Sequence, residues 1–152
     1  MYTFDAFISN YPLLTAGAAW AIAQVLKVFT NLVHVRRLDL KMLFASGGMP
    51  SSHSSTVCAL TTACAVKFGF GSTELAISLI LAAIVMRDAS GVRWETGEQA
   101  KLINKMMQEI FSGKPEEIDT GLKELVGHTP FQVVMGAVLG VIIALAMWPL
   151  FR

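Results

Sequence analysis

Charged residues are scarce in this sequence. Asp, Glu, Lys and Arg make up only 15% of the 152 residues, whereas a soluble domain usually has about 25%. Hydrophobic residues make up 54%, and the mean hydropathy is +0.57. This balance argues against a soluble protein and predicts a single membrane-embedded domain over residues 1–152. The net charge of +1 also argues against a nucleic-acid partner, because such proteins present a basic surface.

Cysteine and histidine are also rare. The two cysteines, Cys58 and Cys64, lie six residues apart in one apolar run, so we interpret them as small apolar residues and not as a disulfide. Together with three histidines they are too few for a Cys/His metal site, and no carboxylate cluster is visible. We therefore expect neither a metal nor another cofactor. No basic residue precedes the first apolar run, so no cleavable signal peptide is expected.

Four apolar runs dominate what remains. They cover residues 13–35, 51–68, 74–88 and 131–151, and about 20 apolar residues suffice to cross a bilayer. The sequence therefore predicts an all-α integral membrane bundle of about four transmembrane helices. Residues 95–111 and 116–126 have helical spacing with mixed polarity, which predicts cytoplasmic amphipathic helices that lie on the membrane surface or cap the bundle.

The basic residues predict the orientation of the chain. They are concentrated in the first and third connections between apolar runs, and such connections face the cytoplasm. We therefore expect an inner (plasma) membrane protein with both termini outside. Under this topology the polar residues that end or begin the runs gather at one depth on the cytoplasmic side.

A polar stripe runs along the first apolar segment. Gln24, Lys27 and Asn31 follow one another at helical spacing and share one face. A lysine in a membrane span usually faces the protein interior or a water-filled cavity. We therefore expect Lys27 to point inward, although it could also extend to the membrane interface.

The segment Gly47-Gly48-Met49-Pro50-Ser51-Ser52-His53-Ser54-Ser55 has an unusual composition for a connection between helices. Glycine lets backbone N–H groups approach a ligand, proline suits the first turn of a helix, and serine caps it. Helix N-termini bind anions, and histidine exchanges protons near neutral pH. The segment predicts an anion site with an acid–base group, although a Ser-capped helix with an incidental histidine is an open alternative.

The expected topology brings this segment close to the other polar clusters, which contain Asp88, Arg93 and His128. Cations and N–H groups suit the charged equatorial oxygens of a phosphoryl transition state. Two histidines suit a two-step displacement, in which one attacks phosphorus and the other protonates the leaving alkoxide.

The same residues resemble a known family. Pro50-Ser51-Ser52-His53 is similar to the Pro-Ser-Gly-His signature of the type 2 phosphatidic acid phosphatases, which are related to the vanadium haloperoxidases. The pattern from Gly127 to Val133 resembles the third motif of that superfamily. Further matching segments, at 88–93, 97–100 and 122–124, make the chain similar to its small divergent branch.

This resemblance implies a role for each matching residue. His128 would be the nucleophile and His53 the general acid for the leaving lipid alcohol. Ser51 and the backbone N–H of Ser52 would bind phosphoryl oxygens. The phosphate-binding cations would be Lys27 and Arg93, joined by Arg37 or Arg36 and by Lys123.

The sequence also departs from the family pattern. His34 occupies the position of the first-motif arginine, and Gly121-Leu122 occupy the positions of the third-motif Ser-Arg. Gln132 stands where an aspartate orients the nucleophilic histidine. The carbonyl of a glutamine can accept the imidazole N–H, and Asp88 or Glu124 would supply the missing charge.

The sequence therefore predicts a metal-independent lipid phosphatase, with phosphatidylglycerol phosphate as the best candidate substrate. Two alternatives stay open: a non-catalytic membrane protein that binds anionic lipid or assembles with a partner, and a transporter or channel subunit. Gly136 and Gly140 lie four apart in the last run, a spacing that favours close helix packing and makes a homodimer plausible.

Overall fold

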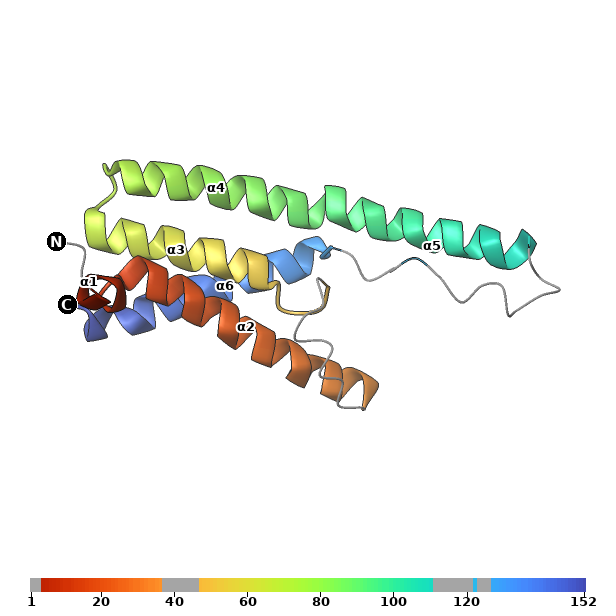
Figure 1. Cartoon of the computed structure of the whole chain (residues 1–152), viewed down its shortest axis with the longest axis horizontal. Helices are drawn as coiled ribbons and strands as arrows, with labels where there is room; N and C mark the ends of the chain where they lie inside the picture. Colours follow the sequence, from red (N-terminus) through yellow and green to blue (C-terminus); the bar gives the residue numbers. More distant parts are fainter. Residues whose placement is uncertain (1–3, 37–46, 111–121, 123–126) are drawn as a thin grey trace.

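The computed structural model describes residues 4–36, 47–110, 122 and 127–152, and these form a helical bundle (Figure 1). No strand occurs among them, so the predicted all-α class is confirmed. The helices are α1 (Phe4–Ile8), α2 (Tyr11–Val35), α3 (Ser52–Phe68), α4 (Thr73–Ser90), α5 (Val92–Ile110) and α6 (Pro130–Met147), followed by a 3-10 turn at Trp148–Leu150. The predicted helix over 116–126 falls almost wholly outside the described residues.

Side-chain caps define where most of these helices begin. Asn10 caps α2, Ser51 caps α3, Ser72 caps α4 and Thr129 caps α6, each by accepting a backbone N–H from the first turn. The sequence predicted a helix over 51–68 with a serine cap, and α3 confirms this, with Ser51 as the cap and Pro50 before it.

Three segments are long and apolar enough to cross a membrane: Tyr11–Val33, Thr73–Ile110 and Pro130–Leu150. The fourth predicted span, α3, has 17 residues and packs against α2, α4 and α6. Because protein surrounds it on several sides, α3 is built from small and hydroxylated residues in place of long apolar ones. Thr61, for example, donates from its hydroxyl to the Ser78 carbonyl of α4 at 3.0 Å.

The contact between α3 and α6 depends on two glycines. A Cβ added at Gly136 would lie 2.3 Å from the Ser51 carbonyl oxygen, and one at Gly140 would lie 2.3 Å from that of Ser55. The predicted close packing is therefore present, but it lies within one chain. The glycine face suggested a homodimer, and α3 of the same molecule occupies that face. A dimer remains a prediction without this support.

The ends of the helices and the turns between them are divided between two opposite ends of the bundle. Helix α1, the C-terminus and the turn between α3 and α4 lie at one end, whereas α3 and α6 begin toward the opposite end, where α2 finishes (Figure 1). This is the arrangement expected of a chain that crosses a layer four times. The predicted polar clusters therefore share one end of the molecule.

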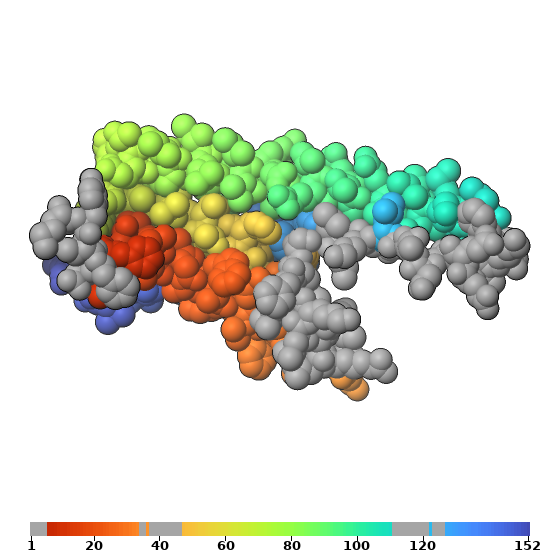
Figure 2. Space-filling view, in the orientation of Figure 1, coloured from red at the N-terminus to blue at the C-terminus, as the bar shows by residue number. Residues whose placement is uncertain are grey.

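Helix α5 differs from its prediction in where it lies. After the break at Gly91 it continues away from α4 and extends past the ends of α2, α3 and α6, as Figure 2 also shows. The interpretation that it caps the bundle is therefore wrong. Apolar side chains remain exposed along it, among them Leu102, Met106 and Ile110, next to exposed charged residues such as Lys101.

Candidate active site

The starts of α3 and α6 meet at one end of the bundle. The Ser51 N–H donates to the Gln132 carbonyl at 3.2 Å, which joins the cap of one helix to the first turn of the other. The first N–H groups of a helix have no acceptor within it, and they carry partial positive charge. Two such ends side by side favour an anion between them.

One histidine comes from each helix start. His53 lies in the first turn of α3, and His128 lies just before the cap of α6. Their ring centroids are 5.9 Å apart, with the rings edge to face. His128 is 1% exposed, and its backbone N–H donates to the Ala89 carbonyl at 2.9 Å. Two imidazoles separated by 75 residues therefore meet, as the sequence predicted.

The hydrogen bonds of Gln132 determine which nitrogen of His128 carries the proton. The Gln132 side-chain oxygen accepts the Thr129 backbone N–H at 3.2 Å and lies 3.3 Å from His128 Nδ1. A backbone N–H can only donate, so the atom facing it must be the amide oxygen. That oxygen can only accept from His128, which places the proton on Nδ1 and leaves the lone pair on Nε2.

His128 Nε2 is buried, and it makes no hydrogen bond of normal geometry within the described chain. The pKa of His128 is lowered from 6.5 to about 4, chiefly by burial, and its hydrogen bond to Gln132 opposes this shift. The positive charges of Lys27 and His53 contribute to the lowering, and the nearby Gly48 carbonyl has a weaker raising effect. At neutral pH this imidazole is therefore uncharged, which is the form that a nucleophile requires.

Lys27 is confirmed as an inward-facing residue, since only 1% of it is exposed. It lines a cavity of about 810 Å³ between the second half of α2, the 47–50 segment and the start of α6. Thr30 closes part of the wall by donating to the Met49 carbonyl at 2.6 Å. The other lining residues in the described chain are Phe29, Asn31, Val33, Arg36, Gly48, Met49 and Gln132.

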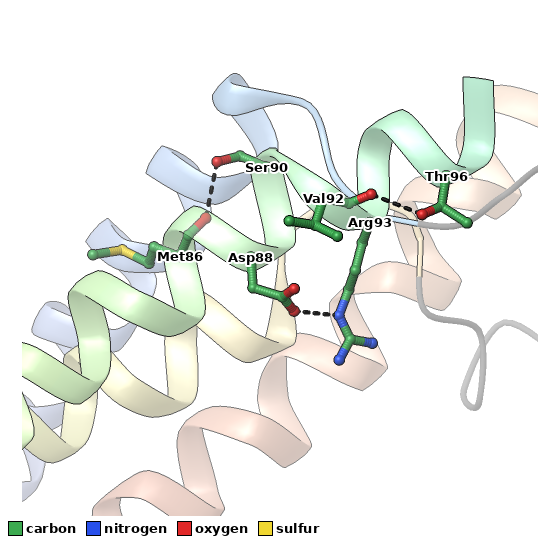
Figure 3. A network of polar contacts seen from close by, with 6 residues as sticks. All are labelled: Met86, Asp88, Ser90, Val92, Arg93 and Thr96. Carbon is green, nitrogen blue, oxygen red and sulfur yellow. Dashed lines mark hydrogen bonds and ion pairs between the residues drawn. The ribbon is translucent and has the colours of Figure 1, made fainter. Parts of the chain in front are cut away.

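Asp88 and Arg93 pair with each other across the junction of α4 and α5. The Arg93 Nε donates to an Asp88 carboxylate oxygen at 2.5 Å (Figure 3), and both side chains are nearly half exposed. Asp88 was expected to supply charge to His128, but its contact in the described chain is with Arg93. The pair leaves the outer nitrogens of the Arg93 guanidinium directed away from Asp88. The charges of both residues act on the His53 imidazole.

Ser51 and Ser52 lie at the predicted place but are buried. The Ser51 hydroxyl oxygen accepts the Ser54 N–H at 3.3 Å and the Ser54 hydroxyl at 3.1 Å. Its clearest role is to cap α3, and phosphate binding by its hydroxyl stays a prediction. The Ser52 N–H is one of the groups without an intrahelical acceptor, so it can donate to an anion.

Gly127 fixes the position of the neighbouring His128. Its φ of 85° belongs to the left-handed region that favours glycine. A Cβ added there would lie 2.4 Å from the Trp94 backbone nitrogen. The residue therefore seats the His128 segment directly on the first turn of α5.

Comparison with known proteins identifies the family of the chain. A family model described as the Divergent PAP2 family matches residues 8–143. The chain belongs to the Divergent PAP2 family. It is also 39% identical over 150 residues to an uncharacterized membrane protein, YuiD, of Bacillus subtilis (strain 168), covering 92% of this chain and 95% of that relative. No solved structure matches the chain significantly.

Among the predicted site residues of this Divergent PAP2 member, the structure gathers His53, His128, Lys27, Ser51 and Ser52 at one end of the bundle, with Arg93 and Asp88 beside them. Arg37, Lys123 and Glu124 lie outside the described residues. Sequence reasoning missed the cap formed by Thr129 and Gln132. The signal was present, because Thr129-Pro130-Phe131-Gln132 has the spacing of a capping box.

Proposed function

We propose that this protein is a membrane lipid phosphatase that hydrolyses a lipid phosphomonoester through a phosphohistidine intermediate. The observation that carries the proposal is the meeting of His53 and His128 at two helix starts beside the buried Lys27. An uncharged imidazole with a free lone pair, a second imidazole and several cations are the groups that phosphoryl transfer needs. Membership of the Divergent PAP2 family supports the same reaction class.

The reaction has two balanced steps. His128 Nε2 attacks phosphorus, the bond from phosphorus to the lipid oxygen breaks, and protonated His53 gives its proton to the leaving alkoxide. Water then attacks the phosphohistidine while His53 takes a proton from it. The P–N bond breaks, phosphate leaves, and both histidines return to their starting forms.

The cations and N–H groups stabilise the charge that develops on the equatorial phosphoryl oxygens. Lys27 contributes from α2, Ser52 through its backbone N–H, and Arg93 from α5. Gln132 keeps the His128 lone pair on the attacking nitrogen. Arg37 and Lys123 remain proposed phosphate ligands on the strength of the sequence resemblance alone.

The proposed location is the inner (plasma) membrane with the site facing the cytoplasm, as the distribution of Lys and Arg suggests. A substrate made at that face fits best, and phosphatidylglycerol phosphate is the candidate we favour.

The test is phosphate release from short-chain lipid phosphates by the purified protein in detergent. His128→Ala is expected to lose turnover and His53→Ala to lose most of it, because each removes a group used in both steps. Arg87→Gln serves as a control, since Arg87 lies outside the proposed machinery. Unchanged turnover in folded His128→Ala would refute the mechanism.

A second candidate function has one observation in its favour. No carboxylate contacts His128 in the described chain, and a neutral amide stands in that place. This favours a protein that binds anionic lipid headgroups without hydrolysing them. It predicts that the purified wild type releases no phosphate from any lipid phosphate, and that headgroup binding survives His128→Ala.

A further inference from the structure

Arg36, which the sequence offers as an alternative to Arg37 among the phosphate ligands, lines the same cavity as Lys27 and Gln132. It ends α2 with a φ of 56°, a left-handed turn that redirects the chain after the helix. An arginine at a helix C-terminus is favourable in any protein. It shares that cavity with Gln132, whose side chain contacts His128, and this place suggests a further role.

The two cations of this cavity come from different places on α2. Lys27 lies within the helix and is buried, whereas Arg36 is the residue that ends it. Arg36 follows Lys27 by nine positions, which corresponds to about 13 Å along a helix axis. The cavity is therefore long enough for two anionic groups, one near Lys27 and one near Arg36.

The cavity wall between the two cations is polar on one side and apolar on the other. Thr30 and Asn31 supply hydroxyl and amide groups, while Phe29 and Val33 are 58% and 81% exposed on the apolar surface of a candidate membrane span. A polar headgroup can therefore lie along the cavity with its chains directed toward the bilayer.

We propose that Arg36 forms a second anion subsite and that the substrate is a lipid with two anionic groups. These are a terminal phosphomonoester, which reacts at the histidines, and an internal phosphodiester, which Arg36 binds. The inference rests on the proposed phosphatase function and narrows its substrate class. A lipid with a single phosphate, such as phosphatidic acid, leaves the second subsite empty.

The experiment compares kcat/KM for phosphatidylglycerol phosphate and for phosphatidic acid with matched chains in mixed micelles. Arg36→Gln is expected to lower the value for the two-anion lipid about tenfold, the effect of removing one charged hydrogen bond. The value for phosphatidic acid should change by less than about twofold. Arg36→Lys, which keeps the charge, should retain most of the preference.

Arg87→Gln is the matched control, because it removes an exposed arginine from the last turn of α4 that does not line the cavity. It should leave both values unchanged. Equal losses for both lipids in Arg36→Gln, or no loss for either, would overturn the subsite. If the wild type hydrolyses neither lipid, the phosphatase function itself fails, and that result is distinct from a loss of selectivity.

Discussion

Replacing Gly127 with alanine tests how the site is held together. The new Cβ would lie 2.4 Å from the Trp94 nitrogen and 2.5 Å from the Arg93 carbonyl carbon, whereas ordinary contact begins at 3.4 Å. All the atoms it meets are backbone, so no side chain can rotate away. The 127–128 segment must therefore shift from α5 by about 1 Å, and His128 follows directly in the chain.

This substitution is expected to affect both the stability of the protein and the rate of the reaction, and the effect on the rate should be the larger. A left-handed conformation costs an alanine about 1–2 kcal/mol of stability. A displacement of about 1 Å in a catalytic group lowers the rate by about 100-fold. We therefore expect Gly127→Ala to stay folded, with a modest loss of stability, and to lose about 100-fold in phosphate release.

Gly69 offers a matched control, because its φ of 86° is nearly the same and nothing lies within 4 Å of an added Cβ. Gly69→Ala should show only the left-handed cost in thermal unfolding, a smaller loss than that of Gly127→Ala, and keep its activity. The reasoning fails if the two variants lose activity equally, or if Gly127→Ala remains as active as the wild type.

Two further predictions concern α6. Gln132→Glu keeps the capping box and places a carboxylate beside His128 Nδ1, so the pKa of His128 should rise from about 4. Because His128 must be unprotonated to attack, the acid limb of kcat/KM should then move to higher pH. An acid limb that does not move would contradict the contact between residue 132 and His128. Gly140→Ala forces a Cβ against the Ser55 carbonyl and should lower the free energy of unfolding by about 1–3 kcal/mol, whereas Gly17→Ala, with open space around it, should not.

The sequence predicted the helices and the meeting of His53 and His128 well, for local reasons. Apolar runs and serine caps determine where helices lie, and an even number of crossings brings His53 and His128 to the same end. Lys27 was predicted to face inward because its polar neighbours share one helical face. Each of these inferences depends on spacing along the chain, and such spacing can be read without coordinates.

The partners of individual side chains were harder to predict. Asp88 pairs with Arg93 because the break at Gly91 directs α5 onward from α4, and a glycine permits many such directions. The dimer face was misjudged because a glycine pair specifies close packing but not the partner. Both features depend on tertiary arrangement, which local pattern does not determine.

The most direct test of the central claim is to trap the phosphoenzyme. The purified protein is mixed with a lipid carrying a radiolabelled terminal phosphate, quenched with alkali after a short interval, and digested for mass spectrometry. The mechanism predicts a phosphohistidine at His128, with more label in His53→Ala if that variant still slowly attacks, and none in His128→Ala. Label on another residue, or turnover with no label at His128, would contradict it.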